Sequence, residues 1–130
     1  MIKLGVLGAG GKMGRRIIEL ALNDKELEVI LALERKGHHL IGKSIDKVKI
    51  SSSLDGIFLT DAIIDFTIPE ASMENLAYVL QYKKPLVLAT TGFNEEQTAK
   101  IRDAAKSIPI VFSPNMAVGV NLLFGIVGEI

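Results

Sequence analysis

The stretch MIKLGVLGAGGKMG, residues 1–14, decides the fold that this sequence encodes. Its apolar first half runs into Gly8, and Gly11 and Gly14 follow at intervals of three residues. Apolar residues then recur at the three- and four-residue spacing of a helix, with charged residues on the other face. These apolar positions are Met13, Ile17, Leu20 and Ala21. The stretch therefore predicts a buried strand, a glycine-rich turn and an amphipathic helix that ends near residues 23–24.

A glycine-rich turn between a strand and a helix start is typical of a phosphate-binding site. Free backbone N–H groups and the positive end of the helix macrodipole converge there. Gly8 allows the tight turn, while Gly10 and Gly11 let a pyrophosphate approach the backbone. Gly14 allows the helix to pack closely against the strand. The common G-x-G-x-x-G spacing would need glycine in place of Met13, so the turn fits G-x-x-G-x-x-G instead. A glycine-rich turn without a ligand is the alternative.

The composition of the 130-residue chain restricts its class. A hydrophobic content of 48% can form a sizeable core, and the length is that of one domain. Fifteen basic and fifteen acidic residues cancel, and no basic cluster alternates with aromatic residues. Neither nucleic acid nor a membrane is therefore expected as a partner. Because cysteine is absent and no apolar run approaches the roughly 20 residues of a membrane span, we expect a soluble cytoplasmic protein without a metal site.

Strands alternate with helices along the rest of the chain. Apolar runs predict further buried strands at residues 27–33, 62–66, 85–89 and 109–112. Residues 36–53 are interpreted as a long loop around one short edge strand near Val48, and residues 54–59 as a short helix.

Two further helices carry start signals. Thr67 is expected to cap the first of them, with Glu70 three residues later and Pro69 in the first turn. Its predicted buried face consists of Met73, Leu76, Ala77 and Leu80. Asn94 and Gln97 predict a capping box at the start of the second helix. Its predicted inner face consists of Ile101, Ala104, Ala105 and Ile108.

This alternation predicts an α/β fold, a Rossmann-type doubly wound parallel sheet with helices on both faces. In such a sheet the ligand lies in the crevice beyond the carboxyl ends of the strands. Four segments are expected to meet there, namely residues 8–13, 34–35, 89–91 and 113–116.

Glu34 lies 20 residues after Gly14, at the end of the second predicted strand. An acidic side chain at this place accepts hydrogen bonds from the adenine ribose of a dinucleotide. Arg35 next to it can instead pair with a 2′-phosphate, because a guanidinium matches phosphate geometry, or it is a solvated strand end. The two residues leave NADH and NADPH open as cofactors.

Other polar positions receive a structural interpretation. His38 and His39 lie in the loop with no visible partner to orient an imidazole, so a surface loop is favoured over a catalytic or metal-binding role. Thr67 is a helix cap or a cofactor contact. Asp65, between apolar neighbours at a strand end, is interpreted as a hydrogen-bonded structural residue rather than a general base.

Several motifs in the same order resemble a known family. They are GAGGKMG at residues 8–14, DFT at 65–67, TTGF at 90–93, and Asn115 followed by VGVN at 118–121. Together they resemble 4-hydroxy-tetrahydrodipicolinate reductase, also called dihydrodipicolinate reductase, and the resemblance covers most of the chain. It implies an oxidoreductase that uses NADH or NADPH to reduce a cyclic, imine-type dicarboxylate on the diaminopimelate route of lysine biosynthesis.

Carried over by position, the resemblance implies a set of cofactor-binding residues. The pyrophosphate would be bound by Gly8, Ala9, Gly10, Gly11, Lys12 and Met13. Glu34 would bind the adenine ribose and Arg35 the phosphate of NADP. The nicotinamide side would be lined by Thr67, Ala89, Thr90, Thr91, Ser113, Pro114, Asn115 and Met116. Ala89 stands where the family usually has glycine, and Ser113-Pro114 replaces two small residues.

The resemblance also implies that cofactor binding and catalysis lie in different domains. Family members are longer and carry a catalytic H-H-x-x-K segment and a substrate-binding S-G-T segment in a second domain, which we expect to be absent here. Residues 1–115 are assigned to the dinucleotide-binding domain, and residues 116–130 to a helix leading to the missing domain. That helix is apolar on nearly all sides and is expected to pack against something the chain does not contain.

Two functions remain as expectations. The first is the NAD(P)H-binding domain of such a reductase, inactive alone, with no catalytic residue of its own, and part of a homo-oligomer when full length. The second is a stand-alone dinucleotide-binding sensor or regulatory module.

Overall fold

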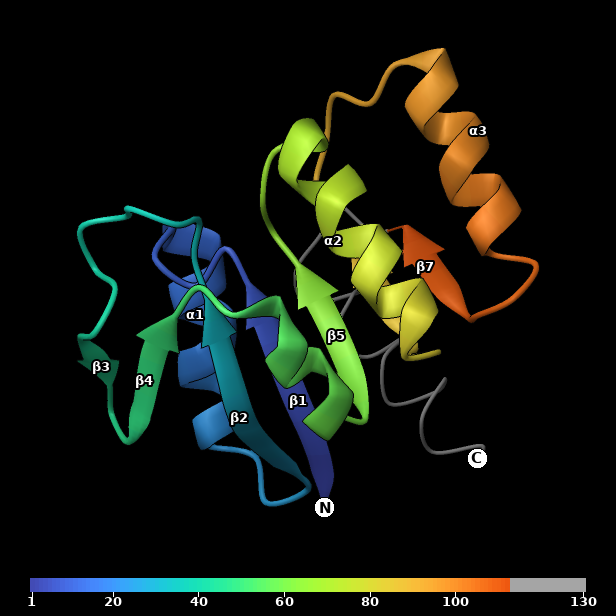
Figure 1. Ribbon diagram of the computed structural model, residues 1–130. Coiled ribbons are helices and arrows are strands. Elements are labelled where there is room, and N and C mark those ends of the chain that lie inside the picture. Colours follow the sequence, from blue (N-terminus) through green and yellow to red (C-terminus); the bar gives the residue numbers. More distant parts are fainter. Residues whose placement is uncertain (113–130) are drawn as a thin grey trace.

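Seven strands form one sheet in the computed structural model, which describes residues 1–112 (Figure 1). The strands are β1 Ile2–Leu7, β2 Leu27–Leu33, β3 Ser44–Ile45, β4 Val48–Ser51, β5 Ala62–Asp65, β6 Leu86–Leu88 and β7 Ile110–Phe112. The helices are α1 Lys12–Leu22, α2 Pro69–Gln81 and α3 Glu95–Ala104, with a short 3₁₀ helix, η1, at Leu54–Leu59. The helix predicted from residue 116 onward lies outside the described residues.

The sheet has the strand order β3-β4-β2-β1-β5-β6-β7. All neighbouring strands run parallel except β3, which is antiparallel to β4. The chain moves outward from β1 in one direction through β2 and β4, and then returns to build the other half through β5, β6 and β7. The predicted doubly wound, Rossmann-type sheet is therefore confirmed, and its order reverses beside β1.

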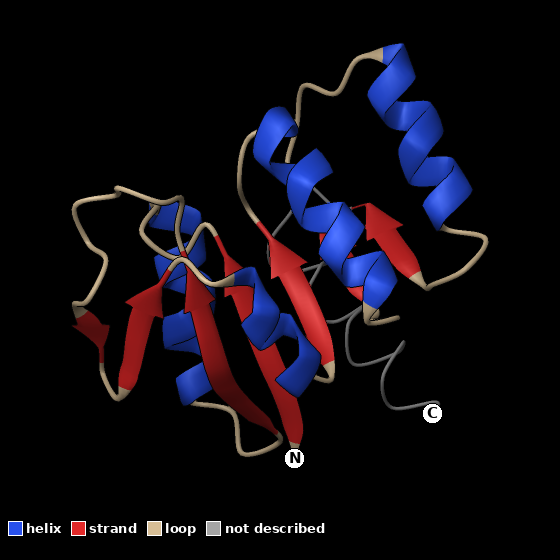
Figure 2. Cartoon of the chain, in the orientation of Figure 1, coloured by secondary structure: helices blue, strands red, loops and turns tan. Residues whose placement is uncertain are grey.

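Both faces of the sheet are covered. In Figure 2, α1 lies on one face, and η1 and α2 lie on the other. The buried residues form two matching cores: Ile17 and Ile18 of α1 belong to one, and Leu76 of α2 to the other. Ile63 and Ile64, adjacent in β5, belong to opposite cores. A strand buried on both faces explains why the sequence shows continuous apolar runs rather than alternation.

The buried face of α1 differs from the prediction. Met13 and Leu20, predicted to be buried, are 44% and 38% exposed. The residues that α1 buries are Gly14, Ile17, Ile18 and Ala21. The difference arises because Gly14 packs against the preceding turn and so selects the face of the helix that meets the sheet.

The predicted cap of α2 is wrong. The helix begins after Ile68 without a side-chain cap, although Pro69 does occupy its first turn. Thr67 instead donates a hydrogen bond to the buried carboxylate of Asp65. The buried residues of α2 are Ser72, Asn75, Leu76 and Val79, while Ala77, which the sequence placed inside, is exposed.

The capping box at α3 is confirmed. The Gln97 N–H donates to Asn94 Oδ1 at 2.8 Å, and the Asn94 N–H donates to Gln97 Oε1 at 2.9 Å. Ile101, Ala104 and Ile108 are buried as predicted. Ala105 is exposed, contrary to the prediction.

Residues 36–53 contain two strands where one was predicted. β4 includes Val48, but it is paired on both sides, and the edge of the sheet is formed by β3. The connection between them turns at Asp46, whose φ of 54° is in the left-handed region. Because this turn lacks the Asn-Gly or Asp-Gly pair typical of a hairpin, the sequence did not reveal it. The predicted short helix at residues 54–59 is confirmed as η1.

Within residues 1–112, no helix is both long and apolar enough to span a membrane.

Candidate functional site

The glycine turn joins the ends of two strands and the start of α1. The N–H groups of Gly8 and Ala9 donate to the carbonyl oxygen of Leu33 at 2.9 and 3.0 Å, which ties the end of β1 to the end of β2. Gly8 has a φ of 86°, and a Cβ on it would lie 2.6 Å from the Phe66 carbonyl oxygen. A Cβ on Gly14 would overlap the carbonyl oxygen of Gly8. The helix can therefore begin directly against the turn only because these two positions are glycine.

Gly10 and Gly11 differ in what faces them. A Cβ on Gly11 would meet no atom nearer than the Gly8 carbonyl oxygen at 3.6 Å. Gly11 is also the N-cap residue of α1 and offers no side chain to the free N–H groups of the first turn. A Cβ on Gly10 would instead lie 2.8 Å from His38 Cε1 and 2.9 Å from Glu34 Oε2. The start of α1 is therefore open to an anion at Gly11, while Gly10 is covered by two side chains.

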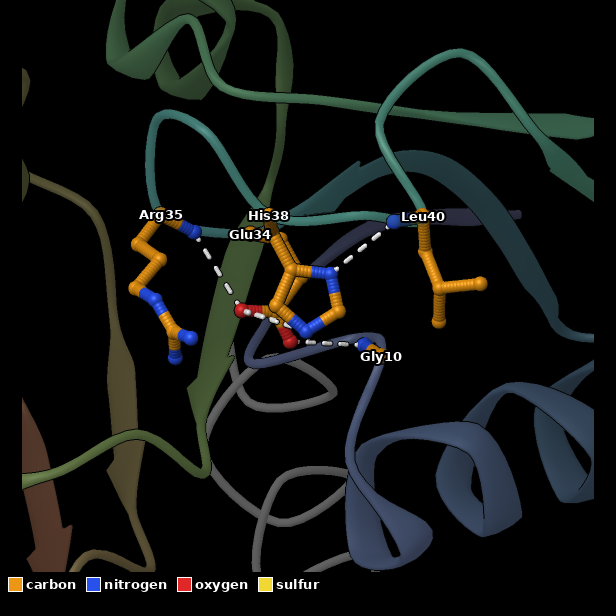
Figure 3. A network of polar contacts seen from close by, with 5 residues as sticks. All are labelled: Gly10, Glu34, Arg35, His38 and Leu40. Carbon is orange, nitrogen blue, oxygen red and sulfur yellow. Dashed lines mark hydrogen bonds and ion pairs between the residues drawn. The ribbon is translucent and has the colours of Figure 1, made fainter.

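Glu34 connects the end of β2 to the glycine turn (Figure 3). Its Oε2 accepts the Gly10 N–H at 2.8 Å, and its Oε1 accepts the Arg35 N–H at 3.2 Å. Its own N–H donates to the Ser51 carbonyl oxygen at 2.9 Å, which fixes the backbone against β4. The side chain is 11% exposed. The Glu34 carboxylate is thus held beside the glycine-rich turn that the sequence predicted to bind phosphate.

His38 lies against Glu34, contrary to its interpretation as a surface-loop residue. Its side chain is 11% exposed, and its Nε2 lies 4.0 Å from Glu34 Oε1. The Leu40 N–H donates to His38 Nδ1 at 3.1 Å, so the imidazole has the orienting partner that the sequence did not show. His39 stacks on this ring with centroids 4.5 Å apart and is exposed, as the interpretation required.

A reverse turn brings His38 back to the strand end. The His38 N–H donates to the Arg35 carbonyl oxygen at 3.0 Å, and Gly37, the third residue of the turn, has a φ of 86°. Glycine at this position is the signature of a type II turn. The segment Arg35-Lys36-Gly37-His38 was therefore a signal that could have placed the imidazole near Glu34.

A cleft of about 620 Å³ opens beyond the carboxyl ends of the strands. Cavities of this size are usual for small ligands. The predicted site residues that line it are Gly8, Gly10, Gly11, Glu34, Arg35 and Thr67. The sequence missed several others, including Ser52, Ser53, Asp55 and Tyr78. Ser52 and Ser53 follow β4, and the pairing of β4 with β2 that brings them there was not predicted.

The remaining predicted site residues do not line this cleft. Ala9 is buried beneath the turn, and Lys12 and Met13 are exposed on the first turn of α1. Ala89 and Thr90 are buried just after β6, and Thr91 beside them is exposed. The predictions for Ser113, Pro114, Asn115 and Met116 lie outside the described residues.

A second carboxylate, Asp65, organises the end of β5. It is 1% exposed. Its Oδ1 accepts the Thr67 N–H at 2.9 Å and the hydroxyls of Thr67 and Thr90 at 2.6 and 3.3 Å. Its Oδ2 accepts from Asn75 Nδ2 at 3.2 Å, and Ser72 Oγ donates to Thr90 Oγ1 at 2.8 Å. The interpretation of Asp65 as a hydrogen-bonded structural residue is confirmed, and the carboxylate links Thr67 to Thr90.

Burial raises the pKa of Asp65, although hydrogen bonds from Thr67 and Asn75 act in the opposite direction. Removing the carboxylate from water disfavours its charged form, and this cost exceeds the effect of the hydrogen bonds. Among residues 1–112, no three His, Asp or Glu side chains gather in an arrangement that could hold a metal ion.

Comparison with known proteins gives a consistent result. Residues 2–116 match the family described as "Dihydrodipicolinate reductase, N-terminus". The 4-hydroxy-tetrahydrodipicolinate reductase of Burkholderia ambifaria is 40% identical over 129 residues, covering 93% of this chain and 49% of that protein. The reductase of Citrifermentans bemidjiense is 37% identical over 139 residues, covering 100% of this chain and 52% of that protein. The chain thus spans about half the length of the curated relatives it matches.

Solved structures share the fold. A dipicolinate-bound dihydrodipicolinate reductase from Paenisporosarcina sp. TG-14 has a TM-score of 0.74 and 24% sequence identity, over 95% of this chain and 51% of that one. A biliverdin reductase from Synechocystis, solved with biliverdin and NADP+, has a TM-score of 0.71 and 17% identity, over 86% of this chain and 37% of that one.

The buried Asp65 predicts a pH-dependent difference in stability. Because its pKa is raised from 3.8, the folded chain holds the carboxyl proton more tightly than the unfolded chain. This contribution is fully present below the unfolded value and is lost as the pH rises through the raised one. We expect Asp65→Asn, which stays neutral, to gain free energy of unfolding relative to the wild-type chain as the pH rises from about 4 to about 8. Urea unfolding at each pH measures this difference.

Asp61→Asn is the matched control. Asp61 is exposed and accepts the Lys3 N–H at 2.8 Å, a bond that asparagine can keep. It should leave the pH profile of the wild-type chain nearly unchanged. A difference between Asp65→Asn and the wild-type chain that stays constant over the pH range would contradict the raised pKa.

Proposed function

The chain belongs to the dihydrodipicolinate reductase family, whose N-terminal part it matches over residues 2–116, and on this basis we propose how it functions. We propose that residues 1–115 bind NADH or NADPH for the reduction of a cyclic, unsaturated dicarboxylate on the diaminopimelate route of lysine biosynthesis. The observation that carries the proposal is the cleft in which Glu34 faces the glycine turn. The matched relatives are named for this reductase activity, and one neighbour in fold was solved with NADP+.

The glycine turn and Glu34 suit two adjacent groups of a dinucleotide, the pyrophosphate and the adenine ribose. Gly11 leaves the start of α1 open, so the pyrophosphate would lie there, where N–H groups and the helix dipole favour negative charge. Glu34 offers acceptor oxygens at the end of β2, so the adenine ribose would lie beside it. Arg35 is exposed at the rim of the same cleft and would meet a 2′-phosphate. Ala9, Lys12 and Met13 would support the pyrophosphate side through the backbone of the turn.

The nicotinamide would lie on the side of Thr67. Thr67 lines the cleft, and the Asp65 carboxylate holds its hydroxyl together with that of Thr90. These contacts fix the strand ends against which a nicotinamide ring would rest, with Ala89 and Thr91 beside them. When bound, the reduced cofactor supplies the hydride. We propose that Ser113, Pro114, Asn115 and Met116 complete this side.

We further propose that the full-length protein is a cytoplasmic homo-oligomer in which a second domain contributes the catalytic groups. The half of each curated relative that this chain does not match supports a further domain in those proteins. On this proposal, the 130-residue chain binds the cofactor without reducing the substrate.

Replacing Glu34 tests the ribose contact. Glu34→Ala should weaken NADH binding by roughly 10-fold or more, because hydrogen bonds to a charged group are each worth about 1.5 kcal/mol or more. NADPH should be weakened less, because its 2′-phosphate is also freed from repulsion by the carboxylate. Calorimetric titration of the wild-type and variant chains with both cofactors measures the two losses.

Glu28→Ala is the matched control, since Glu28 is exposed on the same strand and does not line the cleft. It should change neither affinity. Equal losses of NADH and NADPH in Glu34→Ala would contradict the ribose contact, and failure of the wild-type chain to bind either at millimolar concentration would contradict the proposed function.

A reductase assay tests the division between domains. The 130-residue chain, saturated with NADPH and supplied with the cyclic dicarboxylate substrate, should show no oxidation of NADPH above the background without protein. Appreciable turnover would show that the chain itself carries the catalytic groups and would refute their assignment to a second domain.

A further inference from the structure

We propose that His38 is a specificity-determining residue that, together with Glu34, recognises the 2′-hydroxyl of the adenosine ribose and so favours NADH over NADPH. The inference rests on the proposed function, because it concerns the choice between the two cofactors in the same cleft. His38 lines this cleft and comes from the turn that follows β2.

The imidazole is held in one orientation. His38 Nδ1 accepts the Leu40 N–H at 3.1 Å, so in the neutral ring the hydrogen is on Nε2. Figure 3 shows that Nε2 points toward the Glu34 carboxylate. The ring therefore presents a fixed N–H donor to the region beside Glu34.

This donor has no partner of its own among the described residues. Nε2 lies 4.0 Å from Glu34 Oε1, which is too long for a hydrogen bond. The carboxylate is committed elsewhere: Oε2 accepts the Gly10 N–H at 2.8 Å, and Oε1 accepts the Arg35 N–H at 3.2 Å. An ionised carboxylate oxygen accepts about two hydrogen bonds, so Oε1 keeps capacity for one more.

A donor and an acceptor 4.0 Å apart suit a hydroxyl group between them. A hydroxyl oxygen about 2.8 Å from each atom accepts the Nε2–H hydrogen and donates its own hydrogen to Oε1, with both bonds of ordinary length. A phosphate dianion can accept from Nε2 but has no hydrogen to donate to Oε1. It would also place like charge against the carboxylate. The pair thus discriminates for the ribose hydroxyl and against a 2′-phosphate.

The probes are NADH, NADPH and the NADH analogue that lacks the 2′-hydroxyl of the adenosine ribose, each titrated into the 130-residue chain. His38→Phe keeps an aromatic ring to stack on His39 but removes the donor. We expect it to weaken NADH binding roughly 3- to 10-fold, the range of one neutral hydrogen bond. The deoxy analogue should lose less than about twofold, because it lacks the hydroxyl that His38 contacts. NADPH should lose less than NADH, because the Glu34 carboxylate repels the 2′-phosphate from the position in which it would accept from Nε2.

His39→Phe, which alters the exposed partner of the stacked pair, is the control and should leave all three affinities unchanged. An equal loss for NADH and the deoxy analogue in His38→Phe, or a greater loss for NADPH than for NADH, would overturn the assignment while leaving the proposed function intact. Failure of the wild-type chain to bind any of the three would instead contradict the proposed function and, with it, this inference.

A measurement on the wild-type chain guards against a variant that fails to fold. Nitrogen-15 NMR of His38 should show the ring hydrogen on Nε2, because Nδ1 accepts the Leu40 N–H. NADH should shift the Nε2–H resonance downfield, and the deoxy analogue should not. A ring protonated at Nδ1, or equal shifts with both ligands, would overturn the proposal.

Discussion

The close contact between the backbone of Gly14 and the carbonyl oxygen of Gly8 underlies the rest of the site. A Cβ on Gly14 would overlap this oxygen, so the contact exists only because the side chain is absent. It holds the first turn of α1 against the turn that follows β1, where the N–H groups of Gly8 and Ala9 donate to the Leu33 carbonyl oxygen at the end of β2. The residue after β2 is Glu34, which then reaches Gly10. One steric requirement thus brings a helix N-terminus and an acidic side chain to the same cleft.

Most of the fold could be predicted because burial on both faces of the sheet leaves long apolar runs. The limits of these predictions are physical. Periodicity alone placed Met13 inside, because it could not show that the side of α1 with Gly14 and Ile18 would face the sheet. Threonine is a common helix cap, but the hydroxyl of Thr67 donates to the buried carboxylate of Asp65 instead of capping α2.

Part of the candidate site could be predicted from the sequence, at positions where only one or a few residue types meet the local requirement. The glycines and Glu34 were found from spacing alone, since each position has a steric or hydrogen-bonding requirement that few residues meet. His38 was not, because its orientation depends on a turn at Gly37 and a bond from Leu40, neither of which the interpretation of a surface loop included. Ser52 and Ser53 reach the cleft only through the pairing of β4 with β2.

Two carboxylates, Asp65 at the end of β5 and Glu34 after β2, have different roles. Asp65 is almost fully buried, and its hydrogen bonds hold the hydroxyls of Thr67 and Thr90 in place. Glu34 keeps part of its side chain accessible and lies in the cleft, where its oxygens can meet a ligand. The environment of each group, rather than its residue type, sets its role.

If the cleft between the glycine turn and Glu34 is the dinucleotide site, NADH should perturb the backbone amides that surround it. A titration of the nitrogen-15-labelled chain with NADH, followed by the backbone amide resonances, tests this. We expect the largest shifts at Gly10, Gly11, Glu34 and Arg35, with those of α3 nearly unchanged. Shifts centred on α3 or on the β3–β4 hairpin, with none at the glycine turn, would contradict it.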